Sequence, residues 1–116
     1  MNTHHNEKVL VFGYSDSADR YSNMAFHLLK QFDHRPVAFN PRNDDPAKLD
    51  AEFDTVTLYV NPTVHEKFEP VLDKLKFKRI IFNPGTEDSR LIKKYQDKGI
   101  IVEVGCTLVM LRTDQY

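Results

Sequence analysis

The sequence alternates short apolar segments with segments of helical periodicity, and this alternation limits the possible folds more than any other feature. The apolar segments are rich in β-branched and aromatic residues and cover residues 9–12, 37–39, 56–60, 80–82 and 100–104. Between them, apolar residues recur at the three- and four-residue spacing of one helix face. Strands that alternate with helices predict a parallel sheet built from right-handed crossover units, and therefore an α/β fold.

Two of the predicted strands are apolar at every position. Residues 9–12 read VLVF and residues 80–82 read IIF. Strands covered by helices on both faces have this continuous pattern, whereas strands with one face in water alternate between apolar and polar residues. We therefore expect a Rossmann-like, three-layer α/β/α fold with a five-stranded, mainly parallel sheet.

Three helices are predicted between the strands, over residues 21–31, 63–76 and 87–98. Thr63, with Glu66 three residues later, has the pattern of a helix N-cap. Gly99 occupies the usual position of a C-terminal helix stop. The polar segment 43–53 is long enough for one or two helical turns before the third strand.

The size and composition fit one soluble domain. The 116 residues allow a single hydrophobic core, so one domain is predicted over residues 1–116, with a polar and flexible N-terminus over residues 1–7. The 16 Lys and Arg residues against 17 Asp and Glu residues lack the basic excess of nucleic-acid-binding proteins. No apolar run has the length of a membrane span or the form of a signal peptide. We expect a cytoplasmic protein with no nucleic-acid or membrane partner.

A single cysteine, Cys106, excludes an intramolecular disulfide and is consistent with a reducing compartment. The apolar tail over residues 108–111 is predicted to pack on its own domain. The sequence does not indicate an oligomeric state or a protein partner.

Ligands of such folds bind at the carboxyl ends of the strands, where the strand order changes direction. The loops at those ends are rich in Gly, Pro, Asn and Ser and cover residues 13–22, 40–42, 61–62 and 83–86. The first loop begins with Gly13, in the place of the first glycine of a dinucleotide-binding turn. Ser15, Ser17, Arg20 and Ser22 follow it at the start of a helix, which is a favourable place for an anion. The alternative is a plain strand–turn–helix joint whose serines cap the helix.

The first two loops differ from a standard NAD site. Ser15 and Ala18 replace the second and third glycines of the G-x-G-x-x-G fingerprint. The second strand ends in Asn40, Pro41 and Arg42 instead of the acidic residue that holds the ribose of NAD. A basic residue there suits a phosphorylated ribose, although an Asn-Pro turn with a solvated arginine has the same sequence. A phosphorylated nucleotide other than NAD is the ligand that these loops favour.

Five segments of the chain resemble the stand-alone CoA-binding domain proteins. They are VFGYSDSADRYSNMAFHLL, VAFNPR, LYVNP, IIFNPGTED and VEVGCTLVMLRT, and together they cover residues 8–113 in order. The resemblance implies the fold of the CoA-binding domain of the succinyl-CoA synthetase α subunit. It also implies a site for coenzyme A, a small-molecule nucleotide ligand, at the strand-end loops.

The resemblance assigns each loop a part of this ligand. The implied contacts are Gly13, Tyr14, Ser15, Asp16 and Ser17 around the phosphates, Arg20 and Ser22 at the first helix, Arg42 near the nucleotide phosphates with Asn40 and Pro41 before it in the same loop, Val60, Asn61 and Pro62 beside the adenosine, and Asn83, Pro84 and Gly85 near the pantetheine. Asp16 and Asp19 depart from this scheme, because they place negative charge beside the phosphates unless they cap the helix or pair with Arg20.

The sequence contains no recognised catalytic arrangement and no metal-binding spacing. His27, His34 and His65 fall on separate elements, where we expect surface or half-buried positions. Cys106 is a candidate reactive thiol, because it matches a cysteine of the family at the carboxyl edge of the sheet. Three functions are therefore weighed: non-catalytic binding of coenzyme A or an acyl-CoA, redox chemistry of Cys106 with a CoA-type nucleotide, and NAD(P) binding.

Overall fold

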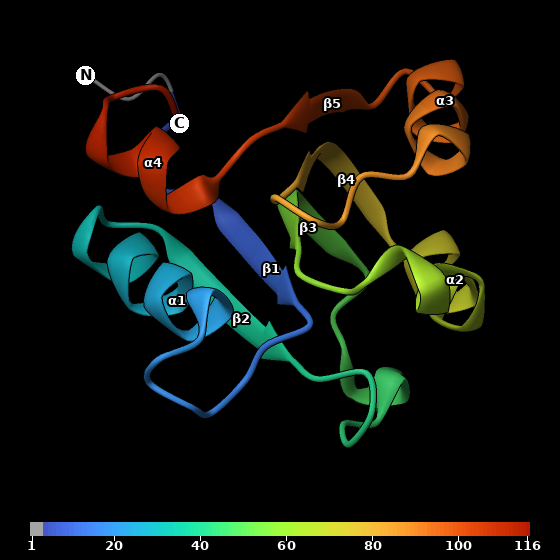
Figure 1. Ribbon diagram of the computed structural model, residues 1–116, viewed down its shortest axis with the longest axis horizontal. Coiled ribbons are helices and arrows are strands. Elements are labelled where there is room, and N and C mark those ends of the chain that lie inside the picture. The colour runs from blue at the N-terminus through green and yellow to red at the C-terminus, as the bar shows by residue number, and fades with distance from the viewer. Residues whose placement is uncertain (1–3) are drawn as a thin grey trace.

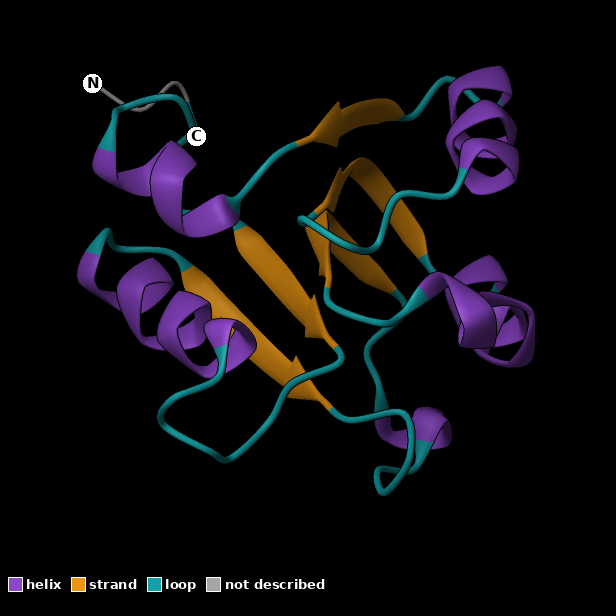
Figure 2. Ribbon diagram, in the orientation of Figure 1, coloured by secondary structure: helices purple, strands orange, loops and turns teal. Residues whose placement is uncertain are grey.

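The computed structural model describes residues 4–116 and contains a five-stranded sheet between two layers of helices (Figure 1; Figure 2). The strands are β1 (Lys8–Phe12), β2 (Arg35–Phe39), β3 (Glu52–Leu58), β4 (Lys76–Phe82) and β5 (Ile101–Val104). The helices are α1 (Tyr21–Gln31), α2 (His65–Asp73), α3 (Ser89–Asp97) and α4 (Thr107–Arg112), and the short 3₁₀ turns are η1 (Pro46–Lys48) and η2 (Pro62–Val64). The strands are parallel and lie in the order β2-β1-β3-β4-β5. This architecture confirms the predicted Rossmann-like fold class.

Each face of the sheet has its own apolar core. Helices α1 and α4 cover one face, where Leu29 and Leu111 pack against Val9 and Val11 of β1. Helices α2 and α3 cover the other face, where the core includes Leu10 of the same strand (Figure 2). Successive side chains of a strand point to opposite faces, so the continuous apolar run of β1 serves both cores, as its sequence predicted.

The predicted strands are in place, but β3 and β4 extend further toward the N-terminus. They begin at Glu52 and Lys76, before the apolar runs that start at residues 56 and 80. At the N-terminal ends of these two strands, polar residues alternate with the buried Phe53 and Phe77. The sheet therefore has alternating ends around a continuously apolar centre.

The predicted cap at Thr63 is wrong. The side-chain oxygen Oδ1 of Asn61 accepts hydrogen bonds from the backbone N–H and the hydroxyl of Thr63, both at 2.9 Å. Asn61 thereby caps the turn η2, and α2 begins only at His65. The expected stop at Gly99 is present, with φ of 81° in the left-handed region.

Both ends of the described chain contact the sheet face covered by α1. Glu7 is buried, and its carboxylate lies 2.9 Å from the guanidinium of Arg79. The apolar tail forms α4 and packs against α1, as predicted. Part of the predicted flexible N-terminus, residues 1–3, lies outside the described residues. Among residues 4–116, no helix has the length and apolar character required to cross a membrane.

Candidate functional site

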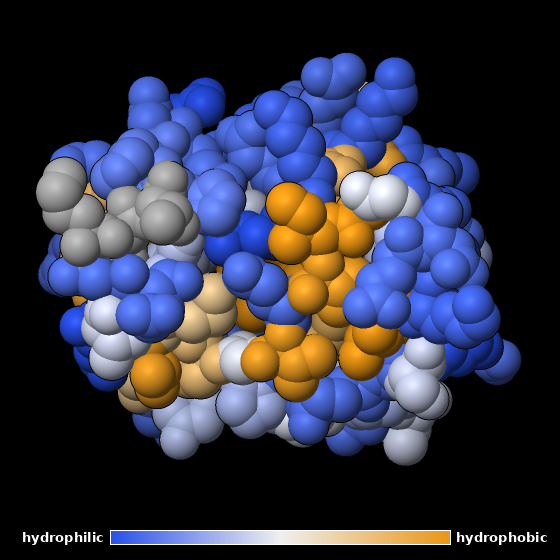
Figure 3. Space-filling model, turned by 90° about the horizontal axis from the view of Figure 1, so that it is seen from above, coloured by the Kyte–Doolittle hydropathy of each residue, from blue (hydrophilic) through white to orange (hydrophobic). Residues whose placement is uncertain are grey.

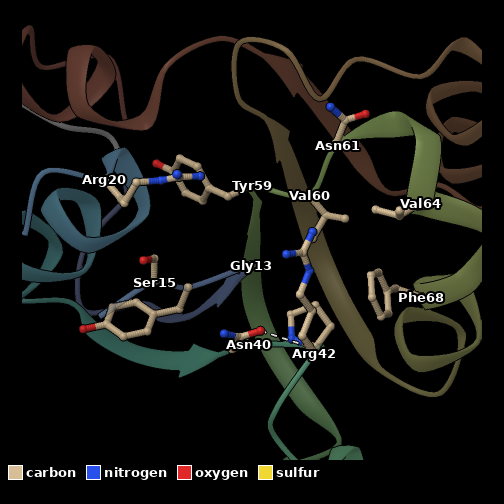
Figure 4. Close-up of a pocket in the computed structure, with 12 residues that line it drawn as sticks. Gly13, Ser15, Arg20, Asn40, Arg42, Tyr59, Val60, Asn61, Val64 and Phe68 are labelled. Atoms are coloured by element: carbon tan, nitrogen blue, oxygen red, sulfur yellow. Dashed lines mark hydrogen bonds between the residues drawn. The ribbon is translucent and has the colours of Figure 1, made fainter. Parts of the chain in front are cut away.

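A pocket of about 270 Å³ opens at the carboxyl ends of β1, β2 and β3 (Figure 4). The chain leaves β1 toward β2 on one side and returns to β3 on the other side, so the strand order changes direction between β1 and β3. Ligands of open parallel sheets bind at this switch point. The predicted residues that line the pocket are Gly13, Tyr14, Ser15, Arg20, Asn40, Pro41, Arg42, Val60 and Asn61. We call this cavity the switch-point pocket.

A second, smaller pocket of about 170 Å³ lies beside the first one. Both pockets are lined by Gly13, Arg20 and Tyr59, so the two form adjoining parts of one groove. The second pocket reaches Ser22 of α1 and Pro84 of the loop after β4, which are both predicted site residues. We call it the β4-side pocket.

Other predicted residues line neither pocket. Asp16, Ser17 and Gly85 are exposed on the loops, and Pro62 is half-buried in η2. Asn83 is buried for a structural reason, because its side-chain amide nitrogen donates to the hydroxyl of Thr57 at 2.7 Å. Its side-chain oxygen accepts the backbone N–H of Thr107 at 2.9 Å, which joins the end of β4 to the start of α4.

The loop after β1 is held by its own serines. The hydroxyl oxygen of Ser22 accepts the backbone N–H of Ser15 at 3.0 Å, and the hydroxyl oxygen of Ser15 accepts that of Ser17 at 3.2 Å. Arg20 is the N-cap residue of α1, and no described side chain caps this helix. The alternative in which serines cap the helix is therefore wrong. Among the described residues the backbone N–H groups of Tyr21 and Ser22 have no partner, so they are available to water or a ligand, whereas that of Asn23 donates to the carbonyl oxygen of Arg20 at 3.1 Å.

Two arginines extend into the switch-point pocket. Figure 4 shows Arg20 reaching across from the start of α1 to Tyr59, and Arg42 rising from the loop after β2 toward Val60. Within the described range 4–116, neither guanidinium forms an ion pair, and Asp16 and Asp19 are exposed and do not pair with Arg20. The structure thus leaves two unpaired positive charges at the switch point.

The loop that carries Arg42 is ordered by short local bonds. The side-chain oxygen of Asn40 accepts the backbone N–H of Arg42 at 2.9 Å, drawn as a dashed line in Figure 4. The carboxylate of Asp44 accepts the backbone N–H of Asn40 at 2.7 Å. These bonds hold the backbone under Arg42 while its side chain remains exposed.

The apolar wall of the switch-point pocket was not predictable from the sequence. Val64 and Phe68 line it from η2 and α2, opposite the loops after β1 and β2. Their apolar side chains did not indicate a place in a binding site, because apolar residues at this spacing are equally typical of the helix face that packs against a sheet.

Tyr59, which the sequence did not indicate as a site residue, lines both pockets. Its hydroxyl is buried, and among residues 4–116 no partner makes a well-aligned hydrogen bond with it. The nearby hydroxyls of Thr57 and Thr107 already contact each other at 2.7 Å. Burial raises the pKa of Tyr59 to about 12, more than these two hydroxyls lower it, so the phenol is neutral at physiological pH.

Cys106 and the histidines lie outside the groove. Cys106 is half-buried just before α4 and lines neither pocket. His34 and His65 are buried, which corrects the expectation of surface or half-buried positions, whereas His27 is exposed. Within the described part of the chain, no group of His, Cys, Asp and Glu side chains could hold a metal ion.

The CoA binding domain family matches residues 7–112, which include every strand and helix described above. The chain belongs to this family. No curated protein matches the chain. Among solved structures, an uncharacterised protein shares 32% sequence identity, with a TM-score of 0.84 over 97% of this chain and 100% of that one. Prb, described as the PH1109 protein redesigned for binding, shares the fold at 18% identity, with a TM-score of 0.80 over 98% of this chain and 87% of that one.

The residues of the groove fit the parts of a coenzyme A molecule. Unpaired guanidinium groups and an uncapped helix start suit phosphates. Val60, Val64 and Phe68 provide an apolar wall of the kind that packs against a base.

Proposed function

We propose that this protein binds coenzyme A or an acyl-CoA in the groove formed by the switch-point and β4-side pockets, and that it does so without catalysing a reaction. The observation that carries the proposal is the pair of unpaired arginines, Arg20 and Arg42, at the switch point of a CoA binding domain. Coenzyme A carries a diphosphate and a ribose phosphate, so its nucleotide half is a polyanion. Two guanidinium groups on separate loops match a ligand with separated phosphates.

The shape of the groove suggests an orientation for the ligand. The apolar wall at Val60 and Phe68 favours the adenine in the switch-point pocket. Arg20 lines both pockets, so a diphosphate beside it would lead the pantetheine arm toward Pro84 in the β4-side pocket. This orientation agrees with the resemblance, which places the adenosine at Val60 and the pantetheine near Pro84.

Redox chemistry of Cys106 is not part of the proposed function. Cys106 is half-buried and lines neither pocket, so nothing brings its thiol to a ligand in the groove. A free, half-buried cysteine behaves as a small packing residue unless a nearby positive charge activates it.

Calorimetric titration with coenzyme A tests this function. We expect saturable binding that weakens in Arg20→Ala and in Arg42→Ala by roughly 10- to 100-fold, because a charge-assisted hydrogen bond contributes about 1.5–3 kcal/mol. Arg112→Ala, an exposed arginine in the last turn of α4, is the matched control and should bind like the wild type.

Parallel titrations with NADPH and ATP separate coenzyme A from other phosphorylated nucleotides. Absence of binding at millimolar coenzyme A by the folded wild-type protein would rule out the proposed function. Equal affinities of all three variants would contradict the role given to the two arginines.

A further inference from the structure

The two edges of the sheet differ in how they are protected from pairing with another strand. Strands β2 and β5 are the edges. Natural edge strands are commonly protected by proline or by charged side chains, above all lysine. Strand β2 begins with Arg35 and Pro36, whereas β5 reads IVEV. The one charge of β5, Glu103, is occupied by Arg79 of β4 at 3.0 Å. The β5 edge therefore lacks the usual protection.

The outward backbone groups of β5 are those of its two even-numbered valines. Directly after the strand, the backbone N–H of Gly105 donates to the carbonyl oxygen of Phe82 in β4 at 3.0 Å. Hydrogen-bonding groups alternate in direction along a strand, so Glu103 also faces β4, and Val102 and Val104 face away from it. Their N–H groups have no partner among residues 4–116.

Apolar side chains are exposed along the same edge. Ile101 is 56% exposed and Val104 is 58% exposed. Figure 3, which views the molecule from above, shows an apolar patch in the middle of the face where β5 lies in Figure 1. Single exposed apolar residues are ordinary, but an apolar patch beside unpaired backbone groups is typical of an association surface.

A second copy of the chain fits this edge in one register. In an antiparallel pair of two β5 strands, only outward-facing residues exchange hydrogen bonds, so the two-fold axis passes through Val102, Glu103 or Val104. An axis at Glu103 places two carboxylates directly opposite each other, which is unfavourable. An axis at Val104 carries the pairing past the end of β5. An axis at Val102 sets Val102 opposite its own copy and Ile100 opposite Val104, with no like charges opposed.

We infer that this protein forms a two-fold symmetric dimer in which β5 pairs antiparallel with β5 of a second copy, centred on Val102, so that the two sheets become one continuous sheet. The N–H of Val102 donates to the carbonyl oxygen of Val102 in the second copy, and the N–H of Val104 donates to that of Ile100. The N–H of Ile100 is not required, because it already donates to the carbonyl oxygen of Tyr95 at 3.0 Å. The net charge of -1 gives two copies little mutual repulsion.

The dimer and the coenzyme A groove are separate features of the molecule. No residue of β5 lines the switch-point pocket or the β4-side pocket. The groove opens at the carboxyl ends of β1, β2 and β3, and β4 lies between these strands and β5. The inference therefore stands or falls independently of the proposed function.

Sedimentation velocity over a series of protein concentrations tests the dimer. We expect the wild type to convert, as its concentration rises, from the 13.5 kDa monomer to a species of twice that mass. Val104→Lys should weaken the dimer roughly tenfold or more, because the two-fold axis places each new charge at one of two equivalent contacts. Val104 is exposed, so the substitution is compatible with the fold. Tyr21→Lys is the control, at an exposed apolar position beside β1 and β2, and should dimerise like the wild type.

A second variant removes the central hydrogen bonds without adding charge. Val102→Pro lacks the outward N–H but leaves the inward-facing bonds to β4 in place, since proline is tolerated at such edge positions. We expect this variant to be monomeric at concentrations where the wild type is a dimer. Circular dichroism and urea unfolding verify that both β5 variants are folded.

Amide hydrogen exchange of the wild type tests the register. In the dimer the amides of Val102 and Val104 should exchange slowly, and dilution to the monomer should release both. The amide of Glu103 is bonded to β4 and should remain protected throughout. A dimer in which the Val102 amide exchanges freely uses another surface and overturns the inference.

Two further results would also overturn it. One is a folded Val104→Lys variant that dimerises as strongly as the wild type. The other is a wild type that stays monomeric at every concentration, which would leave the β5 edge to a strand of a different protein.

Discussion

Gly13 directly follows β1 and lines both pockets of the groove, and the structure gives two separate reasons for its lack of a side chain. Its φ is 99°, in the left-handed region that favours glycine. A Cβ atom would also lie 3.0 Å from the backbone carbonyl carbon of Tyr59. The glycine therefore permits both the turn of the first loop and the close approach of β1 to the end of β3.

Replacing Gly13 by Ala should destabilise the protein more than the same change at Gly99. Gly99 has a similar φ of 81° but nothing within 4 Å of the added Cβ, so Gly99→Ala measures backbone strain alone. Strain of this kind costs about 1 kcal/mol or somewhat more, and the contact with Tyr59 adds to it at Gly13. Urea unfolding of both variants provides the comparison. Equal losses would mean that β1 and β3 can separate without cost.

At the scale of elements, helices α2 and α3 are joined by a cluster of ion pairs. The carboxylate of Glu69 on α2 lies 2.7 Å from the guanidinium of Arg90 and 2.5 Å from the ammonium of Lys94, both on α3. The hydrogen bond from Arg90 is the main cause that lowers the pKa of Glu69 to about 2. This cluster joins α2, which begins at His65, to α3, which begins directly after Asp88.

Glu69 should make the stability of the protein depend on acid pH. Because its pKa is lower in the folded state than the ordinary value of 4.5, its contribution is complete above that value and is lost as the pH falls toward 2. Glu69→Gln should unfold at lower urea concentration than the wild type at pH 7, and the difference should shrink as the pH falls through this range. A constant difference between pH 7 and pH 3 would contradict the folded-state ion pair.

The sequence predicted the elements better than their ends. Helix α1 matches its predicted bounds, because an amphipathic pattern of this length has one interpretation. The N-terminal ends of β3 and β4 were not predicted, because the charged residues there are exposed while the rest of each strand is buried. Helix α4 was read only as an apolar tail, since six residues are too few to show a helical period.

Some residues of the candidate site could be predicted from the sequence, and others could not. Loop residues such as Gly13 and Arg42 were predictable, because strand-end loops meet at one edge of a parallel sheet whatever the details of packing. Tyr59 and Phe68 were not, since their place in the pocket wall depends on which distant segments the fold brings together.

At the scale of the whole molecule, Tyr116 connects the end of the described chain to its core. The residue is fully buried, and its ring lies 4.2 Å from the guanidinium carbon of Arg79. Arg79 in turn contacts Glu7 of the N-terminal segment and Glu103 of β5, at 2.9 and 3.0 Å. The ring of Tyr116 thus covers a buried charge that joins three distant parts of the sequence.

Removing this ring should cost much of the stability. Tyr116→Ala is expected to lower the free energy of unfolding by about 3–5 kcal/mol, the usual loss for a buried aromatic side chain. Tyr21→Ala is the control, because Tyr21 is 68% exposed and its loss should change stability by about 0.5 kcal/mol or less. Chemical unfolding of both variants measures the difference. Similar small losses would show that residue 116 does not complete the core.

The packing of α4 and Tyr116 onto α1 also bears on how the chain folds during synthesis. Strand β1 and helix α1 are synthesised before α4, so Leu111 and Tyr116 can join the core of Val9, Val11 and Leu29 only when residues 107–116 have followed. Until then the core on this face is incomplete, and part of its apolar surface remains exposed, as in the intermediates of larger proteins that tend to aggregate. The opposite face can assemble earlier, because α2 and α3 precede β5 in the chain. The core on the α1 side is therefore complete only after residues 107–116 have been synthesised, later than α2 and α3 of the opposite face.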